Sequence, residues 1–185
     1  GPQGPQGPQG PPSSVNVSKA YVVWDDDGSN QILFRASQTS DTITISNNTI
    51  GGSNPQISSS GDNVYVIWET FIAGNNDIFF SYSHDAGQTF SEPENISDNP
   101  GGSFNPQISS SGNNVYLVWE DDDLAGDGEI FFAFSTDNGQ TFSTPDNISE
   151  DTVLSVRPQI SSEGNNVYIV WMNDDGNLSL DIFFN

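Results

Sequence analysis

The sequence predicts an all-β protein made of about four similar units, each a sheet of four short antiparallel strands. One apolar strand that ends in Trp recurs four times, and the copies at Trp68, Trp119 and Trp171 stand 51 and 52 residues apart. A turn of sequence S-x-D-x-G-x-T-F recurs between two later strands of the unit. No stretch has the apolar period of a helix. Repetition at this length is typical of architectures in which neighbouring sheets cover each other's apolar faces.

The four strands of a unit follow one another in a fixed order. The first is Pro-Gln-Ile-Ser-Ser, which begins at Pro55, Pro106 and Pro158. The second is β-branched and aromatic on both pleat faces, as expected of a strand covered from both sides, and its copies end at Trp24, Trp68, Trp119 and Trp171. The third follows an acidic loop, and its copies begin at Gln31, Asp77, Glu129 and Asp181. The fourth lies within 42–46, 89–97 and 141–149.

The recurrent turn connects the third strand to the fourth. Its Gly supplies a positive φ angle, while its Ser and Asp side chains can accept hydrogen bonds from turn amides. The residues of the pattern are Ser83, Asp85, Gly87, Phe90, Ser135, Asp137, Gly139 and Phe142. This pattern resembles the Asp-box (BNR repeat) of sialidase-like β-propellers. The resemblance implies a propeller-like array, and in that family the box is a structural turn remote from the active site.

The chain divides into a short arm and a repeat domain. Residues 1–12 follow the Gly-X-Y rule of collagen, and we expect either a triple-helical contact or an extended arm or tag. Residues 13–185 form the repeats, and the predicted blades span about 13–54, 55–105, 106–157 and 158–185. A β-sandwich is the alternative to the propeller-like array. The chain begins at Gly1 without a signal peptide, so we expect a processed form.

The two ends of the repeat domain do not match. The last repeat supplies three strands, whereas 14–18 resembles the end of a fourth strand, as in 94–97. This N-terminal strand can close the last blade within the same chain, or complete a blade of a neighbouring molecule. A third alignment makes 12–16 the first strand of the first blade. The N-terminal arm and the unmatched strands therefore predict self-association, as a trimer or as a filament.

Charge excludes two classes of partner. The chain has 25 acidic and 3 basic residues, and its formal net charge is -22. Such a surface repels phosphate backbones and anionic membrane surfaces, so we expect no nucleic-acid binding. No apolar run approaches membrane-spanning length, so we expect no membrane insertion. The chain has no cysteine, which excludes disulfides and thiolate metal sites.

Acidic loops follow the Trp strand in each repeat and would gather at one end of the array. Carboxylates in flexible loops suit Ca²⁺, although no loop has the EF-hand pattern. The predicted calcium ligands are Asp25, Asp26, Asp27, Asp121, Asp122, Asp123, Asp174 and Asp175.

The residues of a sialidase active site do not stand out. That chemistry uses an arginine cluster, and the chain holds only Arg35 and Arg157, while its single histidine, His84, occupies a variable turn position. No carboxylate pair rises above the repeat background. The sequence therefore predicts no catalytic residues and a protein that is not an enzyme.

Five Asn-X-Ser/Thr sequons predict N-glycosylation in an organism that glycosylates exported proteins. They begin at Asn16, Asn47, Asn95, Asn147 and Asn177.

These features favour an extracellular structural protein, a subunit of a cell-surface filament, stalked appendage or surface layer. The repeats resemble those of large secreted and surface proteins of archaea and bacteria. The alternative is an adhesion module that binds a carbohydrate or protein with the loops at one end. A glycoside hydrolase is the third hypothesis, and the missing arginine cluster weighs against it.

Overall fold

The protein is an all-β stack of four antiparallel sheets. The computed structural model describes residues 19–46, 51–122, 128–149, 154–174 and 179–184, and these contain fourteen strands and no helix. No helix in this part of the chain is therefore long and apolar enough to cross a membrane. The predicted propeller-like array of four blades is confirmed, whereas the arm 1–12 lies outside the described residues.

Each sheet follows the strand order of the chain. The first contains β1 (Tyr21–Asp26), β2 (Gln31–Ala36) and β3 (Ile43–Thr44). The second contains β4 (Ser53–Ser60), β5 (Asn63–Ile72), β6 (Asn75–Ser83) and β7 (Glu94–Asn95). The third contains β8 (Gly102–Ser111), β9 (Asn114–Asp122), β10 (Gly128–Ser135) and β11 (Asp146–Asn147). The fourth contains β12 (Leu154–Glu163), β13 (Asn166–Asp174) and β14 (Ser179–Phe184).

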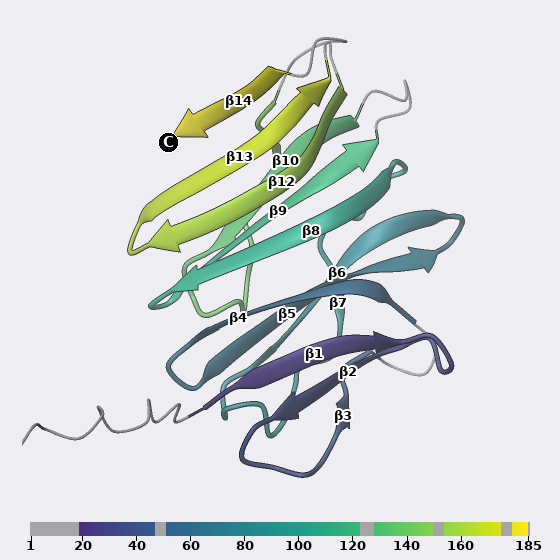
Figure 1. The fold of residues 1–185 in the computed structure, drawn as a ribbon, viewed down its shortest axis with the longest axis vertical. Helices are drawn as coiled ribbons and strands as arrows, with labels where there is room; N and C mark the ends of the chain where they lie inside the picture. Colours follow the sequence, from purple (N-terminus) through teal and green to yellow (C-terminus); the bar gives the residue numbers. More distant parts are fainter. Residues whose placement is uncertain (1–18, 47–50, 123–127, 150–153, 175–178, 185) are drawn as a thin grey trace, which may run out of the picture.

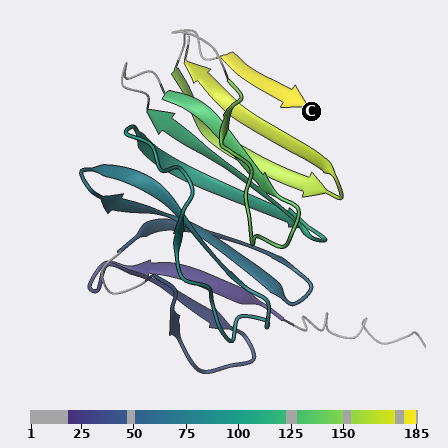
Figure 2. The same ribbon diagram turned by 180° about the vertical axis from the view of Figure 1, so that it is seen from behind.

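The sheets stack in chain order, so the first and fourth lie at opposite ends of the molecule (Figures 1 and 2). The leading strands β4, β8 and β12 lie side by side and line one edge of the stack. Serine hydroxyls join these strands across the sheets, Ser58 to Ser110 at 2.7 Å and Ser109 to Ser162 at 2.8 Å. One edge of the array is therefore a continuous polar seam.

The core consists of three apolar layers, one between each pair of successive sheets. Alternate residues of each Trp strand face opposite neighbours: Trp68 packs toward the first sheet, whereas Tyr65 and Ile67 pack toward the third. The prediction that the Trp strand is buried from both sides is therefore confirmed for the second sheet, because each of its pleat faces is apolar and packs against a neighbouring sheet. Trp68, Trp119 and Trp171 are buried, and Trp24 is only half-buried because its face of the first sheet has no described neighbour.

The fourth sheet differs from the others in register. Trp68 lies opposite Phe79 and Trp119 opposite Phe131, but Trp171 lies opposite Asp181, two residues away from the aligned position Phe183. A two-residue slide keeps each side chain on its own face of the sheet. In the other three sheets, a short strand (β3, β7 or β11) pairs with the outer side of β2, β6 or β10. None of the described strands pairs with the outer side of β14.

Candidate functional site

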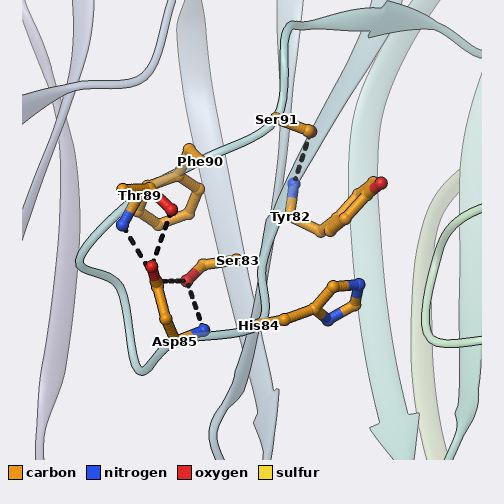
Figure 3. A pocket seen from close by; sticks show the side chains of 7 residues that line it. All are labelled: Tyr82, Ser83, His84, Asp85, Thr89, Phe90 and Ser91. Carbon is orange, nitrogen blue, oxygen red and sulfur yellow. Dashed lines mark hydrogen bonds between the residues drawn. The ribbon is translucent and has the colours of Figure 1, made fainter.

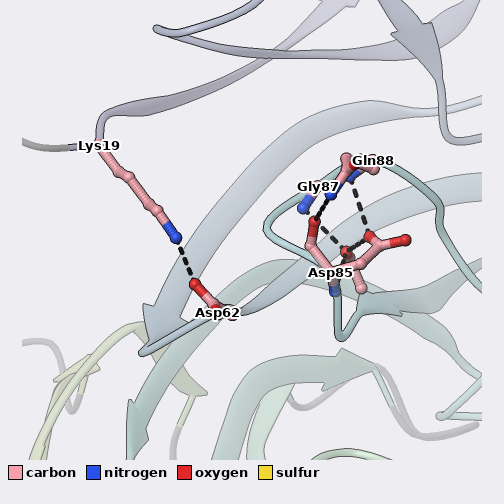
Figure 4. A network of polar contacts seen from close by, with 6 residues as sticks. Lys19, Asp62, Asp85, Gly87 and Gln88 are labelled. Carbon is pink, nitrogen blue, oxygen red and sulfur yellow. Dashed lines mark hydrogen bonds and ion pairs between the residues drawn. The ribbon is translucent and has the colours of Figure 1, made fainter.

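The two turns of sequence S-x-D-x-G-x-T-F, called here the repeat turns (83–90 and 135–142), have the same hydrogen bonds. Asp85 Oδ1 accepts from the amide of Gln88 at 3.0 Å. It also accepts from the amide of Thr89 at 2.9 Å, and Oδ2 accepts from the Thr89 hydroxyl at 2.6 Å (Figure 3). Ser83 Oγ donates to Asp85 Oδ1 and accepts from the Gly87 amide at 2.9 Å. Figure 4 shows the hydrogen bonds of Asp85 and the Lys19–Asp62 ion pair.

Asp137 has the same partners, and both carboxyls are held in the ionised form. Hydrogen bonds from the side chain of Thr141, the side chain of Ser135 and the Thr141 amide lower the pKa of Asp137 to about 2. Partial burial acts to raise the pKa of Asp85, but the bonds from Thr89, Ser83 and Gln88 outweigh it and lower that pKa to about 2 as well. Both carboxylates are thus fully engaged in the turn.

A shallow pocket of about 320 Å³ lies beside the first repeat turn (Figure 3). It is lined by Tyr82, Ser83, His84, Asp85, Thr89, Phe90 and Ser91. The exposed His84 ring lies 4.6 Å from the Tyr82 ring, and its Nδ1 is 2.8 Å from Asn63 Oδ1. The pocket is therefore formed by residues that hold the turn together.

The opposite end of the sheets carries a different repeated feature, a bulge at the start of each leading strand. Asn54, Asn105 and Arg157 have φ angles of 53°, 51° and 57°, and the strand register shifts at each of them. Such backbone is costly for residues other than Gly, although Asn tolerates it better than Arg. The same bulge therefore occurs at the same place in three successive sheets.

The bulge turns a main-chain amide toward a carboxylate of the preceding sheet. Glu69 Oε1 accepts from the amide of Asn105 at 2.6 Å and from Asn54 Nδ2 at 2.9 Å. Glu120 Oε1 accepts from the amide of Arg157 in the same way. We call these five residues, Asn54, Glu69, Asn105, Glu120 and Arg157, the carboxylate row.

The carboxylate row combines held carboxylates with exposed donors. Glu120 is 9% exposed and Glu69 is half-buried, whereas the side chains of Asn54, Asn105 and Arg157 are exposed. Phe71 lies on the same strand face as Glu69, two residues further along β5, and is 73% exposed. Polar groups that converge beside an exposed aromatic ring are typical of ligand-binding surfaces.

The predicted calcium ligands do not gather around one point. Among the described residues, no three carboxylate or histidine side chains could hold a metal ion. Asp121 is buried and accepts from Trp119 Nε1 at 3.2 Å, Ser103 Oγ at 2.8 Å and Asn99 Nδ2 at 2.7 Å. Asp26 accepts from Ser29, while Asp25, Asp27 and Asp122 are exposed. Asp123 and Asp175 lie outside the described residues, as does the side chain of Asp174, and calcium binding stays a prediction.

Another buried carboxyl, Asp77, lies on β6 near the same end. Burial raises the pKa of Asp77, while hydrogen bonds from Asn95 Nδ2 and Asn75 Nδ2, each 2.9 Å long, act against the rise. Asn95 is the first residue of a predicted sequon. Its side-chain amide already donates to Asp77 within the second sheet. Asn147 Oδ1 accepts from the Ser149 amide at 3.1 Å. Asn16, Asn47 and Asn177 lie outside the described residues, and glycosylation stays a prediction.

The stacked β-sheets are similar in fold to those of a solved sialidase. The chain is similar to a Hadza microbial sialidase, Hz136, with a TM-score of 0.56 and 13% identity over 84% of this chain and 42% of that one. It also matches a trans-sialidase-active mutant of Trypanosoma rangeli sialidase (TM-score 0.48, 13% identity, 89% of this chain and 35% of that one). A third match is a GH43 protein, BlXynB from Bacillus licheniformis (TM-score 0.44, 17% identity, 72% and 31%). No protein-family model matches the chain, and no curated protein sequence does.

The chain spans about two-fifths of the length of the sialidase Hz136. The prediction that it is not an enzyme is contradicted by this comparison, because a protein with the same fold is a sialidase. The physical reason for the error is that the arginines were counted over a chain that covers only 42% of the sialidase chain. Where catalytic residues come from several blades, a chain that holds only some of the blades does not contain all of those residues. At 13% identity the likeness shows the fold alone.

Sequence reasoning missed the carboxylate row. The acidic residue directly after Trp was grouped with the loop acids, although Glu69 and Glu120 belong to strands. The signal was present in the sequence: the residue before each Pro-Gln-Ile is Asn, Asn or Arg, and Glu69 and Glu120 stand 36 and 37 residues before Asn105 and Arg157. Only the bulge shows that the two positions meet.

Proposed function

We propose that the chain is the carbohydrate-recognising part of a sialidase-like β-propeller whose repeat turns are Asp-boxes, and that glycan binds at the carboxylate row. The observation that supports this is the Glu69 carboxylate, which is held by Asn54 and by the Asn105 amide of the next sheet. A carboxylate fixed by two donors costs little reorganisation when it accepts a sugar hydroxyl. The exposed side chains of Asn105 and Arg157 beside it can donate to further hydroxyls.

The charge of the site favours neutral sugars. Glu69, Glu120, Asp25 and Asp122 lie toward this end of the sheets, and Arg157 is the cation beside them. A sialic acid carboxylate would meet repulsion from these groups. The proposed ligand is therefore an uncharged oligosaccharide.

Binding to immobilised neutral and sialylated oligosaccharides, followed by titration calorimetry, tests the proposal. We expect saturable binding of neutral glycans, weakened about tenfold by Glu69→Gln or Phe71→Ala. Glu94→Gln is the matched control, because Glu94 is an exposed carboxylate on the outer strand β7. Equal binding by all variants, or no neutral glycan bound, contradicts the proposal. Analysis of the incubated sugars for cleavage products, with Glu120→Gln as the comparison, measures hydrolysis.

We also propose that the protein works outside the cell. The acidic composition and the sequons support an exported, hydrated protein. Fractionation of the source cells with an antibody to the chain tests this, and a signal confined to the cytoplasm contradicts it.

A further inference from the structure

The carboxylate row runs from sheet to sheet and not along one strand. Glu69 on β5 accepts from the amide of Asn105 on β8, which belongs to the next sheet. Glu120 on β9 accepts from the amide of Arg157 on β12, one sheet further along. Because the sheets stack in chain order (Figure 1), each of these bonds joins two neighbours in the stack. The row therefore follows the direction in which the sheets stack.

The side chains of the row are in contact between the second and third sheets. Asn54 Nδ2 donates to Glu69 Oε1 at 2.9 Å within the second sheet, and it lies 3.4 Å from Asn105 Oδ1 of the third. Both asparagine side chains are exposed, although each of these two sheets packs against a neighbour on either side. A ligand can therefore reach this part of the row inside the stack, where the neighbouring sheets are in place.

Each carboxylate of the row uses one oxygen in the fold and leaves the other available. The Oε1 atoms of Glu69 and Glu120 accept the bonds from the next sheet. Among the described residues, the two Oε2 atoms make no hydrogen bond, and neither is buried without a partner, so both are open to solvent. Asn105 uses its Oδ1 within the row, and its Nδ2 makes no hydrogen bond to the described residues. The row thus offers two acceptors and a donor, which sugar hydroxyls can satisfy because they both donate and accept.

The two available carboxylate oxygens are one sheet apart. Glu69 belongs to the second sheet and Glu120 to the third, and sheets that pack face to face lie about 10 Å apart. A single sugar ring does not span this distance, whereas linked rings do. The same type of group also recurs at the next sheet, so the matching ligand repeats its hydroxyls along its length. A polysaccharide chain has this property.

Phe71 adds an apolar surface to one end of this arrangement. Its side chain is 73% exposed and lies on the same face of β5 as Glu69, about 7 Å further along the strand. The third residue after Trp is Asp27 in the first repeat and Asp122 in the third, so the repeat does not require an aromatic ring there. An exposed ring is stabilised when the apolar face of a sugar covers it. The Glu69 end of the row is therefore the stronger of the two contact points.

We propose that the ligand of the carboxylate row is an extended, unbranched, neutral polysaccharide that crosses successive sheets, with the chemistry of cellulose or mannan; this inference rests on the proposed function. One sugar ring packs on Phe71 and donates a hydroxyl to Glu69, and a ring further along the same chain donates to Glu120. The second contact forms without a second loss of translational freedom, so it strengthens the binding of a chain long enough to make it. The net charge of -22 disfavours polysaccharides that carry carboxylates or sulfates.

Titration calorimetry with cellulose and mannan oligosaccharides, from the monosaccharide to the hexasaccharide, tests the proposal. We expect one hexasaccharide per chain, and an affinity that rises by about tenfold or more once the oligomer spans both carboxylates. Equal affinity for the monosaccharide and the hexasaccharide, or binding by neither series, overturns the inference. The proposed function survives that result if other neutral glycans bind to the protein. If no neutral glycan binds, both are wrong.

Glu120→Gln separates the two contact points. Glutamine keeps Oε1 as the acceptor for the Arg157 amide and replaces Oε2 by a donor, so the fold is retained, and a melting temperature checks this. We expect about tenfold weaker binding of the hexasaccharide and unchanged binding of the monosaccharide, which stays at the Glu69 end. Phe71→Ala should weaken both ligands, and Glu94→Gln, on β7, should change neither. If Glu120→Gln affects the monosaccharide and the hexasaccharide equally, or affects neither, the chain does not cross the sheets.

Discussion

Phe90 of the second sheet packs edge-on against Phe34 of the first, with ring centroids 4.9 Å apart and an interplanar angle of 67°. Phe142 and Phe80 repeat this contact between the third and second sheets, at 4.8 Å and 78°. Each repeat turn therefore places its Phe on an aromatic ring of the preceding sheet. The turns, which are local in sequence, hold neighbouring sheets together.

The glycine of the repeat turn is predicted to be irreplaceable for packing as well as for φ. At Gly87 (φ +82°) an added Cβ would lie 2.4 Å from the Phe34 ring, whereas at Gly61 (φ +62°) it would meet nothing within 4 Å. Both Gly→Ala changes cost about 1–2 kcal/mol for the left-handed backbone. We expect Gly87→Ala to cost about 1–3 kcal/mol more than Gly61→Ala. Urea unfolding measures the difference, and equal costs would mean that the ring moves aside freely.

Trp119→Ala is predicted to lower the free energy of unfolding by about 3–5 kcal/mol, because a fully buried ring is removed from between two sheets. The change also deprives buried Asp121 of the Trp119 Nε1 donor. Trp24→Ala is the matched control and should cost less, because Trp24 is only half-buried. Thermal unfolding by circular dichroism measures both, and a neutral Trp119→Ala would contradict the stacked arrangement.

Stability is predicted to fall in acid through Asp85 and Asp137. The folded-state pKa of each is about 2, below the ordinary value of 3.8, so the folded state binds protons less tightly than the unfolded chain. Their contribution is therefore complete above about pH 4 and is lost as pH falls toward 2. We expect the double variant Asp85→Asn/Asp137→Asn to be less stable at neutral pH and to lose less stability over this interval. A pH series of melting temperatures measures it, and parallel curves for the two proteins would refute the assignment.

Calcium is predicted to raise the melting temperature through the acidic loops, since ions that bind only the folded state stabilise it. Melting with calcium and then with a chelator measures the effect, and magnesium serves as the comparison ion. Asp27→Asn should reduce any rise, because Asp27 is an exposed loop carboxylate. Identical melting temperatures in calcium and chelator would rule this prediction out.

Much of the fold was determined by the sequence alone. The spacing of Trp68, Trp119 and Trp171 and the apolar character of both faces of their strands require stacked sheets, since a sheet that is apolar on both faces needs a neighbour on each side. The hydrogen bonds of Asp85 and Asp137 were also foreseeable, because they join residues within a few positions of one another. Hydrogen bonds can be predicted from a sequence when the donor and the acceptor are close along the chain.

The tertiary structure decided what depends on distant residues. Glu69 meets the amide of Asn105 only because a positive-φ bulge turns that amide toward the preceding sheet, and no residue type in the sequence specifies a bulge. The sequence predicts that Asp121 is an acidic residue of an exposed loop. In the structure it is buried, and its carboxylate accepts hydrogen bonds from Trp119, Ser103 and Asn99. Sequence fixes periodicity and turns because these are short-range, whereas burial and contacts between sheets arise only when the sheets have stacked.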